Sequence, residues 1–151
     1  MADYDDHDAL GLAALVASGE ASAEELLDEA LARVARLNPA LNAVVLIREG
    51  EARRAIRAGL PRGPFRGVPF LLKDLGAEAT GFPSHSGSRL WAGTEWPVDS
   101  SLVARLRAAG VVIFGRTTSP EGGIGPATEA AVYGGPTRNP WDLARTPGGS
   151  S

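Results

Sequence analysis

Apolar residues recur at helical spacing through the first forty positions of the chain. Residues 10–16 are predicted to form a short helix, because their apolar positions share one face. A second helix is predicted to start after Ser22. Ser22 and Glu25 have the spacing of a capping box, in which each side chain satisfies a free backbone amide of the first turn. The pair Asn38-Pro39 is expected to end this second helix.

Two shorter elements follow the second helix. Residues 42–47 are a largely apolar run that predicts a strand. Residues 49–58 mix acidic and basic side chains with alanine, which predicts a solvated helix that stops at Gly59. Residues 1–60 are therefore predicted to form a mostly helical layer that contains one strand.

The second half of the chain contains two short apolar runs with a helical pattern between them. Residues 68–72 and 111–114 are predicted to be apolar strands. Asp99 is expected to cap a helix that runs to Ala109 and ends at Gly110. The positions predicted to face inward on this helix are Leu102, Val103, Leu106 and Ala109. Strand, helix and strand at this spacing predict a parallel crossover unit.

Two segments lack a periodic pattern. Residues 76–97 are rich in glycine, serine and threonine and are predicted to be a long functional loop or a set of short turns. Residues 117–151 are again predicted to be loop-rich, with one helical turn after Glu121. The chain has 19 glycines and 11 prolines, and they concentrate after Gly59. This composition supports a loop-rich second half.

Composition and charge narrow the class of protein. The chain is 44% hydrophobic and 22% charged, as is typical of a globular domain. With 15 basic and 18 acidic residues there is no basic surplus that would indicate a nucleic-acid partner. The acidic start of the chain is unlike a signal peptide, and no apolar run approaches the roughly 20 residues that span a bilayer. Cysteine is absent, which excludes disulfides and thiol chemistry within these residues and is consistent with a cytoplasmic location.

Lys73 is the first candidate for chemistry. It follows the apolar strand predicted over residues 68–72. Desolvation favours the neutral amine of a lysine, and a neutral amine can act as a general base. The alternative is a structural lysine at the end of a strand, which extends to solvent or pairs with Asp74. The motif by itself leaves both interpretations open.

The second candidate is the segment 146–151, with the sequence TPGGSS. Its glycines let the backbone approach a ligand, and its serines offer hydroxyl groups. It lacks both the lysine of a phosphate loop and the Gly-x-Ser-x-Gly pattern of a nucleophile elbow, so a flexible turn is the alternative. His7 and His85 are isolated and give neither a catalytic triad nor metal-ligand spacing. Three tryptophans are expected to be packing residues: Trp91, Trp96 and Trp141.

The order of these motifs resembles the amidase signature family. Residues 67–74 (GVPFLLKD) resemble its lysine motif, and residues 115–121 (GRTTSPE), with the Asp99 helix before them, resemble its next blocks. Residues 137–151 (TRNPWDLARTPGGSS) resemble the start of the signature, and residues 22–45 are similar to the N-terminal helices of the family. The resemblance covers essentially the whole chain. The sequence of residues 70–75 (FLLKDL) resembles that of bacterial amidases and cyclic-amide hydrolases more than that of the tRNA-linked amidotransferase subunit.

The resemblance implies an α/β fold, in which helices pack on an incomplete mixed sheet. Residues 1–151 would form the N-terminal part of a single amidase signature domain, with a helical layer over residues 1–60 and a strand–helix–strand unit plus catalytic loops over residues 61–151. The C-terminal remainder of that domain is absent from these 151 residues. We therefore expect an unpaired sheet edge and an exposed apolar face.

The resemblance also implies a Ser-cis-Ser-Lys triad. Lys73 matches the catalytic lysine and Ser150 the bridging serine, whose peptide bond with Gly149 is cis in the family. The lysine takes a proton through the bridging serine and so activates a second, nucleophilic serine. Ile124, Gly149 and Ser151 match positions that can line the substrate pocket. No metal or cofactor is implied.

The implied function is hydrolysis of the C–N bond of a linear or cyclic carboxylic amide through an acyl-enzyme. In the family the nucleophilic serine lies beyond the bridging serine, so it is absent from this chain, and we expect the chain alone to be inactive. The alternative is a non-catalytic remnant or small-molecule binding module that keeps half of the pocket. The expected partners are a small-molecule amide and, for the full-length protein, a second copy in a homodimer. No nucleic acid or membrane partner is expected.

Overall fold

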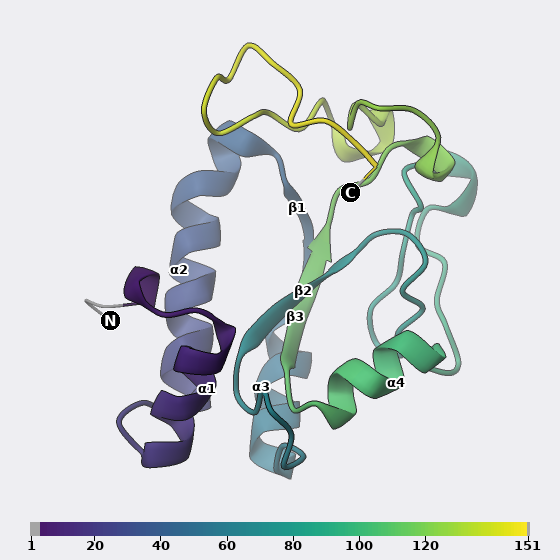
Figure 1. The fold of residues 1–151 in the computed structure, drawn as a ribbon. Coiled ribbons are helices and arrows are strands. Elements are labelled where there is room, and N and C mark those ends of the chain that lie inside the picture. Colours follow the sequence, from purple (N-terminus) through teal and green to yellow (C-terminus); the bar gives the residue numbers. More distant parts are fainter. Residues whose placement is uncertain (1–3, 151) are drawn as a thin grey trace.

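A computed structural model describes residues 4–150 of the chain (Figure 1). The helices and strands follow in the order α1 (Ala9–Ser18), α2 (Ala23–Leu41), β1 (Val44–Ile47), α3 (Glu49–Ala58), β2 (Pro69–Lys73), α4 (Ser101–Ala108) and β3 (Val112–Thr117). Short 3₁₀ turns occupy Tyr4–Asp6, Arg89–Trp91, Glu121–Gly123 and Ala131–Tyr133. The long segments after β2 and β3 are otherwise loops, as predicted, and the turn after Glu121 is present.

The three strands form a mixed sheet in the order β1-β3-β2. The central strand β3 pairs antiparallel with β1 and parallel with β2. Since α4 connects β2 to β3, the predicted parallel crossover unit is confirmed. Within the described residues, β1 and β2 each pair with β3 only, so each leaves one edge unpaired, as expected. The predicted α/β class, with helices on a small mixed sheet, is confirmed.

Helices cover both faces of this sheet (Figure 1). Side chains alternate between the faces along a strand, and the two apolar clusters follow this alternation. On one face Val112 and Phe114 pack with residues of α2 and α3, among them Leu27 and Ala52. On the other face Ile113 packs with residues of α4 and of the loop that follows β2. The sheet is therefore buried between two layers.

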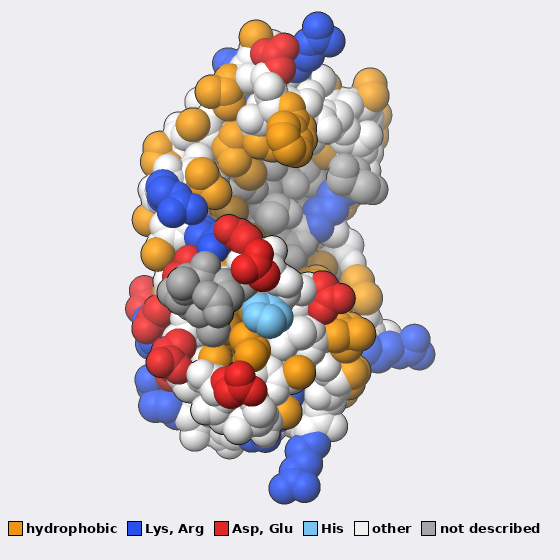
Figure 2. Space-filling view, turned by 60° about the vertical axis from the view of Figure 1, so that its left-hand side comes forward, with side chains coloured by type: hydrophobic (Ala, Val, Ile, Leu, Met, Phe, Trp, Pro, Cys, Tyr) orange, Lys and Arg blue, Asp and Glu red, His pale blue; other side chains and the backbone are white. Residues whose placement is uncertain are grey.

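The α1 and α2 side of the molecule carries acidic and basic side chains intermixed with apolar ones (Figure 2). Arg53 of α3 forms ion pairs with Glu49 of its own helix and with Glu24 and Asp28 of α2. These contacts connect α3 to α2. The prediction of a solvated α3 is therefore correct for one side only, because Ala52 on its other side is fully buried.

The end of α2 differs from the prediction. The capping box is present at its start, but the helix does not stop at Asn38-Pro39 and continues to Leu41. A proline removes one backbone donor, and the last turn of the helix accommodates this loss. The helix ends where Asn42 adopts a left-handed conformation with φ 49° and donates its backbone N–H to Asn38 O. The Asn38 side chain then accepts the N–H of Val44 and starts the strand β1.

The start of α4 also differs from the prediction. Ser100, not Asp99, caps the helix, because its hydroxyl accepts the backbone N–H of Val103. The Asp99 carboxylate instead accepts hydrogen bonds from Thr80 N and Arg107 Nε. Leu102 was predicted to face inward and is 53% exposed, whereas Val103 is fully buried as predicted.

The tryptophans are less buried than predicted. Trp141 is 95% exposed and Trp91 is 46% exposed, so neither is a core residue of residues 4–150. Trp96 is partly buried and donates its Nε1–H to the Ser84 hydroxyl. The prediction of packing roles is therefore wrong for Trp141 and Trp91, because the loops that carry them lie outside the two clusters that cover the sheet.

Gly115 allows β1 and β3 to pair closely, since a Cβ atom at this position would lie 2.1 Å from Leu46 O. We expect Gly115→Ala to lower the free energy of unfolding by about 1–3 kcal/mol, because the strands must move apart to admit the methyl group. Gly50→Ala is the matched control, since Gly50 lies in α3 with no atom within 4 Å of the place that a methyl group would take. It should raise the same free energy by about 0.4–1 kcal/mol. Urea unfolding followed by circular dichroism measures both changes, and equal stability of the two variants would contradict this account of the sheet.

Candidate active site

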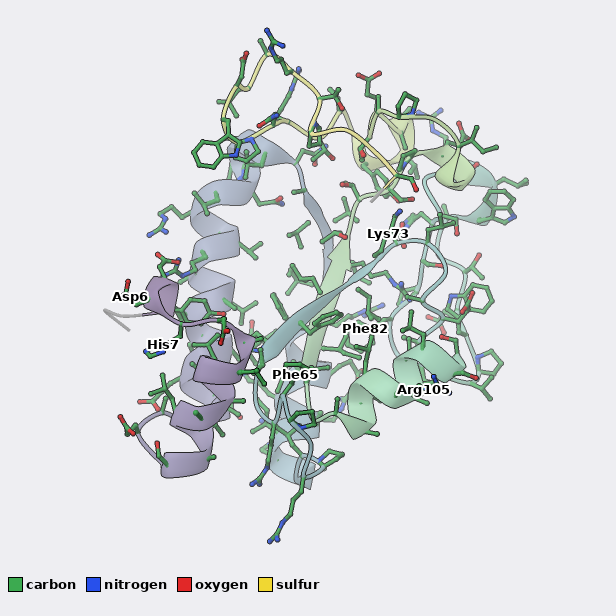
Figure 3. The ribbon with its side chains drawn as sticks, in the orientation of Figure 1. Asp6, His7, Phe65, Lys73, Phe82 and Arg105 are labelled. Atoms are coloured by element: carbon green, nitrogen blue, oxygen red, sulfur yellow. The ribbon has the colours of Figure 1, made fainter. Side chains whose placement is uncertain are left out.

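Lys73 and Ser150 meet at one end of the sheet. Lys73 is the last residue of β2, and its Nζ donates a hydrogen bond of 3.1 Å to Ser150 Oγ across 77 positions of sequence. Figure 3 shows the Lys73 side chain directed toward the C-terminal segment of the chain. The peptide bond between Gly149 and Ser150 is cis. The fold thus brings together the two residues to which the resemblance assigns a proton-transfer role.

The C-terminal segment is held in place by the loop before it. Thr128 Oγ donates a hydrogen bond of 2.8 Å to the carbonyl oxygen of Gly148. Gly149 packs tightly, because a Cβ atom there would lie 3.1 Å from Pro120 Cγ and 3.2 Å from the carbonyl carbon of Pro126. The backbone that precedes Ser150 is therefore fixed by one hydrogen bond and by close packing.

Lys73 and Ser150 both line a cavity of about 600 Å³ between the end of the sheet and the loops. Its wall is largely apolar, with side chains from β2 and α4 that include Phe70 and Leu106. Four threonine residues add polar groups near the strand ends: Thr117, Thr118, Thr128 and Thr137. The cavity can hold a small molecule with its polar group toward Lys73 and Ser150 and its apolar part along the wall that includes Phe70 and Leu106.

The other predicted pocket residues have different positions. Ile124 is 83% exposed and does not line this cavity, so its contact with a substrate stays a prediction. Ser151 lies outside the described residues. Gly149 is not among the residues that line this cavity, so its contact with a substrate stays a prediction. The catalytic roles of Lys73 and Ser150 also stay predictions.

Lys73 is the only lysine among the 15 Lys and Arg residues of the chain. Arginine keeps its proton in proteins, whereas lysine can lose it and act as a base. The one lysine of this sequence therefore lies at the cavity, hydrogen-bonded to a serine.

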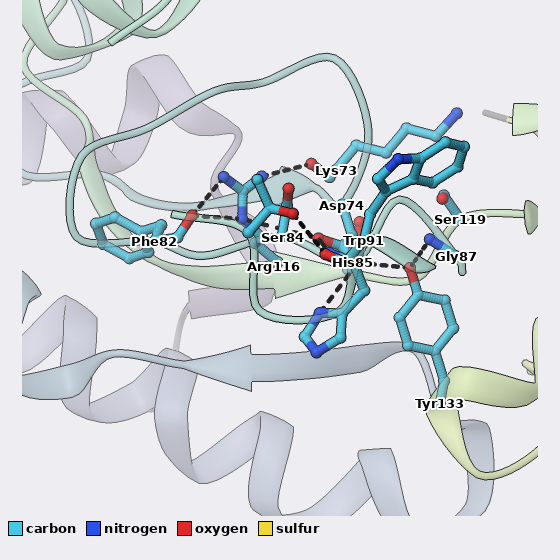
Figure 4. Close-up of polar contacts among 12 residues, drawn as sticks. Lys73, Asp74, Phe82, Ser84, His85, Gly87, Trp91, Arg116, Ser119 and Tyr133 are labelled. Carbon is cyan, nitrogen blue, oxygen red and sulfur yellow. Dashed lines mark hydrogen bonds and ion pairs between the residues drawn. The ribbon is translucent and has the colours of Figure 1, made fainter. Parts of the chain in front are cut away.

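A buried polar network lies directly behind Lys73 (Figure 4). Asp74 is fully buried and accepts hydrogen bonds from the backbone N–H of His85 and from the Tyr133 hydroxyl, the latter at 2.6 Å. Arg116 Nε lies 3.9 Å from Asp74 Oδ1. A buried carboxylate requires such partners, because an unpaired one is strongly destabilised.

Arg116 fixes the backbone around the site. Its guanidinium is buried and donates hydrogen bonds to the carbonyl oxygens of Lys73, Ala77 and Phe82, at distances between 2.7 and 3.0 Å. Burial lowers the pKa of Arg116 from its ordinary value, and the Asp74 carboxylate opposes that effect. Arg116 is not among the residues predicted from the sequence, although a charged residue that continues an apolar strand is a signal for such a role.

The described residues contain no group of three or more histidine, aspartate or glutamate side chains that could hold a metal ion. In the same part of the chain, no helix combines the length and the apolar character needed to cross a membrane.

Comparison with known proteins assigns the family. The Amidase family model matches residues 25–151. The chain is 43% identical over 159 residues to a glutamyl-tRNA(Gln) amidotransferase subunit of Salinispora arenicola, covering 99% of this chain and 32% of that protein. It is 44% identical over 146 residues to the 6-aminohexanoate-cyclic-dimer hydrolase of Paenarthrobacter ureafaciens, covering 95% of this chain and 29% of that protein. The amidotransferase subunit and the cyclic-dimer hydrolase are therefore similar to this chain to nearly the same degree.

Solved structures agree with this result. The 6-aminohexanoate cyclic dimer hydrolase complexed with substrate superposes with a TM-score of 0.88 at 42% identity, over 95% of this chain and 30% of that structure. The peptide amidase from Stenotrophomonas maltophilia superposes with a TM-score of 0.82 at 34% identity, over 97% of this chain and 32% of that structure. The chain spans about a third of the length of the curated relatives it matches. From the family-model match and these relatives, the chain belongs to the amidase signature family.

Proposed function

We propose that this protein hydrolyses carboxylic amides and that residues 1–151 supply its lysine and its bridging serine. The observation that carries the proposal is the hydrogen bond of 3.1 Å between Lys73 Nζ and Ser150 Oγ, in the wall of a cavity large enough for a small amide. A lysine held against a serine hydroxyl is suited to remove a proton from it, and through it from a nucleophile.

In the proposed reaction one proton passes from the nucleophile through Ser150 to Lys73 and then to the departing nitrogen. The Lys73 amine, in its neutral form, accepts the Ser150 hydroxyl proton while Ser150 Oγ accepts the proton of a nucleophilic serine supplied from outside residues 1–151. The nucleophile forms a bond to the amide carbonyl carbon, and the C–N bond breaks as the departing nitrogen receives the proton from Ser150 and Lys73. Water then cleaves the resulting ester, which releases the carboxylic acid and restores the serine.

The proposed substrate is a small linear or cyclic amide. Lys73 is the one charged residue in the cavity lining formed by the described residues, and most of the remaining lining is apolar or carries hydroxyl groups. This lining favours an uncharged acyl part over one that carries a carboxylate or an ammonium group. We also propose that the whole protein is cytoplasmic and forms a homodimer. Light scattering of the purified protein measures its oligomeric state.

Release of free amine from simple linear and cyclic amides tests the proposed function. The polypeptide encoded by the complete reading frame that contains residues 1–151 is expected to turn these substrates over, and Ser150→Ala should lower kcat by about 10²–10⁴-fold. The chain of residues 1–151 alone is expected to show no turnover. Turnover by this chain that survives Ser150→Ala would overturn the proposed mechanism. Binding of amides without turnover by the complete polypeptide would favour a binding module instead.

A further inference from the structure

Tyr133 lies at a junction between the strand that carries Lys73 and the loop that follows β3 (Figure 4). Its hydroxyl donates a hydrogen bond of 2.6 Å to Asp74 Oδ2 and accepts one of 2.9 Å from Gly87 N. Asp74 is the residue directly after Lys73, and its carboxylate is fully buried. One hydroxyl group thus connects the end of β2 to the 3₁₀ turn Ala131–Tyr133.

The loop that contains Tyr133 also holds the segment that carries Ser150. Before Tyr133, Thr128 bonds to the carbonyl oxygen of Gly148, two residues from Ser150. After Tyr133, the Thr137 hydroxyl bonds to Thr118, which follows the last residue of β3. Lys73 and Ser150 therefore belong to two parts of the chain that the Tyr133 hydroxyl joins through Asp74.

We propose that Tyr133 is a positioning residue, whose hydroxyl holds the end of β2 against the loop 128–137 and thereby sets Lys73 Nζ against Ser150 Oγ. The proposal rests on the proposed function for its kinetic consequence, because the pair must be in contact for proton transfer. A displacement of about 1 Å in such a pair can lower a rate on the order of 10²-fold.

The hydroxyl group, rather than the ring, carries this role. Removal of the hydroxyl leaves the fully buried Asp74 carboxylate without its shortest hydrogen bond and the Gly87 N–H without its acceptor. The ring can keep its edge contact with the His85 ring, whose centroid lies 6.2 Å away. Burial and the hydrogen bond to Asp74 raise the pKa of Tyr133 well above its ordinary value, so the hydroxyl remains a donor at neutral pH.

Tyr133→Phe removes this hydroxyl and little else, and Tyr4→Phe is the matched control. Tyr4 is the other tyrosine of the chain, and it packs against a buried apolar cluster that includes Leu12 of α1 and Leu26 of α2. The Arg33 guanidinium lies 4.6 Å from its ring centroid. Both variants lose the same atom from a partly buried ring. A difference between them therefore reports the position of the hydroxyl and not the loss of a tyrosine.

Two measurements test the proposal. In the complete polypeptide, Tyr133→Phe should lower kcat about 10–100-fold with KM within a factor of two, whereas Tyr4→Phe should change neither. In the chain of residues 1–151, the single lysine allows ¹³C-lysine labelling to give one set of lysine signals. The nuclear Overhauser effect between the Lys73 ε-protons and the Ser150 β-protons should be severalfold weaker in Tyr133→Phe and unchanged in Tyr4→Phe, with both variants folded by circular dichroism.

The two measurements separate failure of this proposal from failure of the proposed function. An unchanged Overhauser effect together with an unchanged kcat overturns the positioning role. A loss of activity that follows only the fraction of unfolded protein also overturns it, because that result indicates a purely structural role. A weaker Overhauser effect in a protein that hydrolyses no amide supports the positioning of Lys73 and rejects the hydrolase function.

Discussion

Lys73→Ala is expected to lower kcat for amide hydrolysis by about 10²–10⁴-fold in the complete polypeptide, because it removes the proposed proton acceptor of Ser150. Lys73→Arg is the sharper test. Arginine keeps the positive charge and most of the length of lysine, but its guanidinium does not lose a proton in proteins. If Lys73 acts as a base, the arginine variant should be as impaired as the alanine variant. If Lys73 only supplies charge, the arginine variant should retain much of the rate.

Arg145→Ala is the control for the loss of a positive charge in the same region. Arg145 belongs to the C-terminal segment, its side chain is 77% exposed, and it pairs with Asp142 on the surface. Its removal should leave kcat within a factor of two, since surface charge pairs contribute little. Steady-state release of amine measures all three variants. Retention of more than half of the parent kcat by Lys73→Arg would exclude the role of Lys73 as a base.

Several elements of this fold could be predicted from local sequence alone. The bounds of α3, Glu49–Ala58, agree with the helix predicted from its pattern, and Gly59 ends it with φ 91°. The capping box at Ser22 is present as predicted. Strands β2 and β3 could be predicted because each contains a continuous apolar run, which in β3 corresponds to a strand buried on both faces. These features depend on neighbouring residues, so a local pattern is sufficient to identify them.

The errors occurred where two local solutions were possible and tertiary contacts selected one. Asp99 and Ser100 are both good N-cap residues. Asp99 is engaged by Thr80 and Arg107, from a loop distant in sequence and from the helix itself, so Ser100 caps α4. Pro39 could have ended α2, but the helix continues to Leu41, whose carbonyl oxygen accepts the backbone N–H of Arg138 from a distant loop. Neither choice is visible in a local pattern.

The candidate site was predicted in part. Lys73 and Ser150 were identified through the resemblance to a family, since no spacing rule connects residues 77 positions apart. The buried network behind them was not identified. The sequence predicts Asp74 only as a possible partner of Lys73, whereas its carboxylate accepts hydrogen bonds from the Tyr133 hydroxyl and from the backbone N–H of His85. Such a network depends on the approach of the loop after β2 to the loop after β3 and to Arg116 of β3, which single-sequence patterns do not describe.

Arg116→Met is expected to lower the free energy of unfolding by about 3–5 kcal/mol, because it leaves the buried Asp74 carboxylate without its cationic neighbour. It also leaves the carbonyl oxygens of Lys73, Ala77 and Phe82 without the donors they have now. Methionine fills much of the space of the arginine stem, so the loss reports charge and hydrogen bonding more than volume. Urea unfolding of the complete polypeptide, followed by circular dichroism, measures this change.

The double variant Arg116→Met/Asp74→Leu distinguishes electrostatic loss from general damage to the core. Each single replacement leaves one buried charge without its counter-charge, whereas the double replacement leaves none. We therefore expect the double variant to lose less stability than the sum of the two single losses, by at least about 1 kcal/mol. It should stay less stable than the parent, because the carbonyl oxygens that Arg116 binds remain without a donor. Arg105→Ala on the exposed side of α4 should change stability by no more than about 0.5 kcal/mol. Strictly additive losses at positions 116 and 74 would show that the charges of Arg116 and Asp74 do not compensate each other across their separation of 3.9 Å.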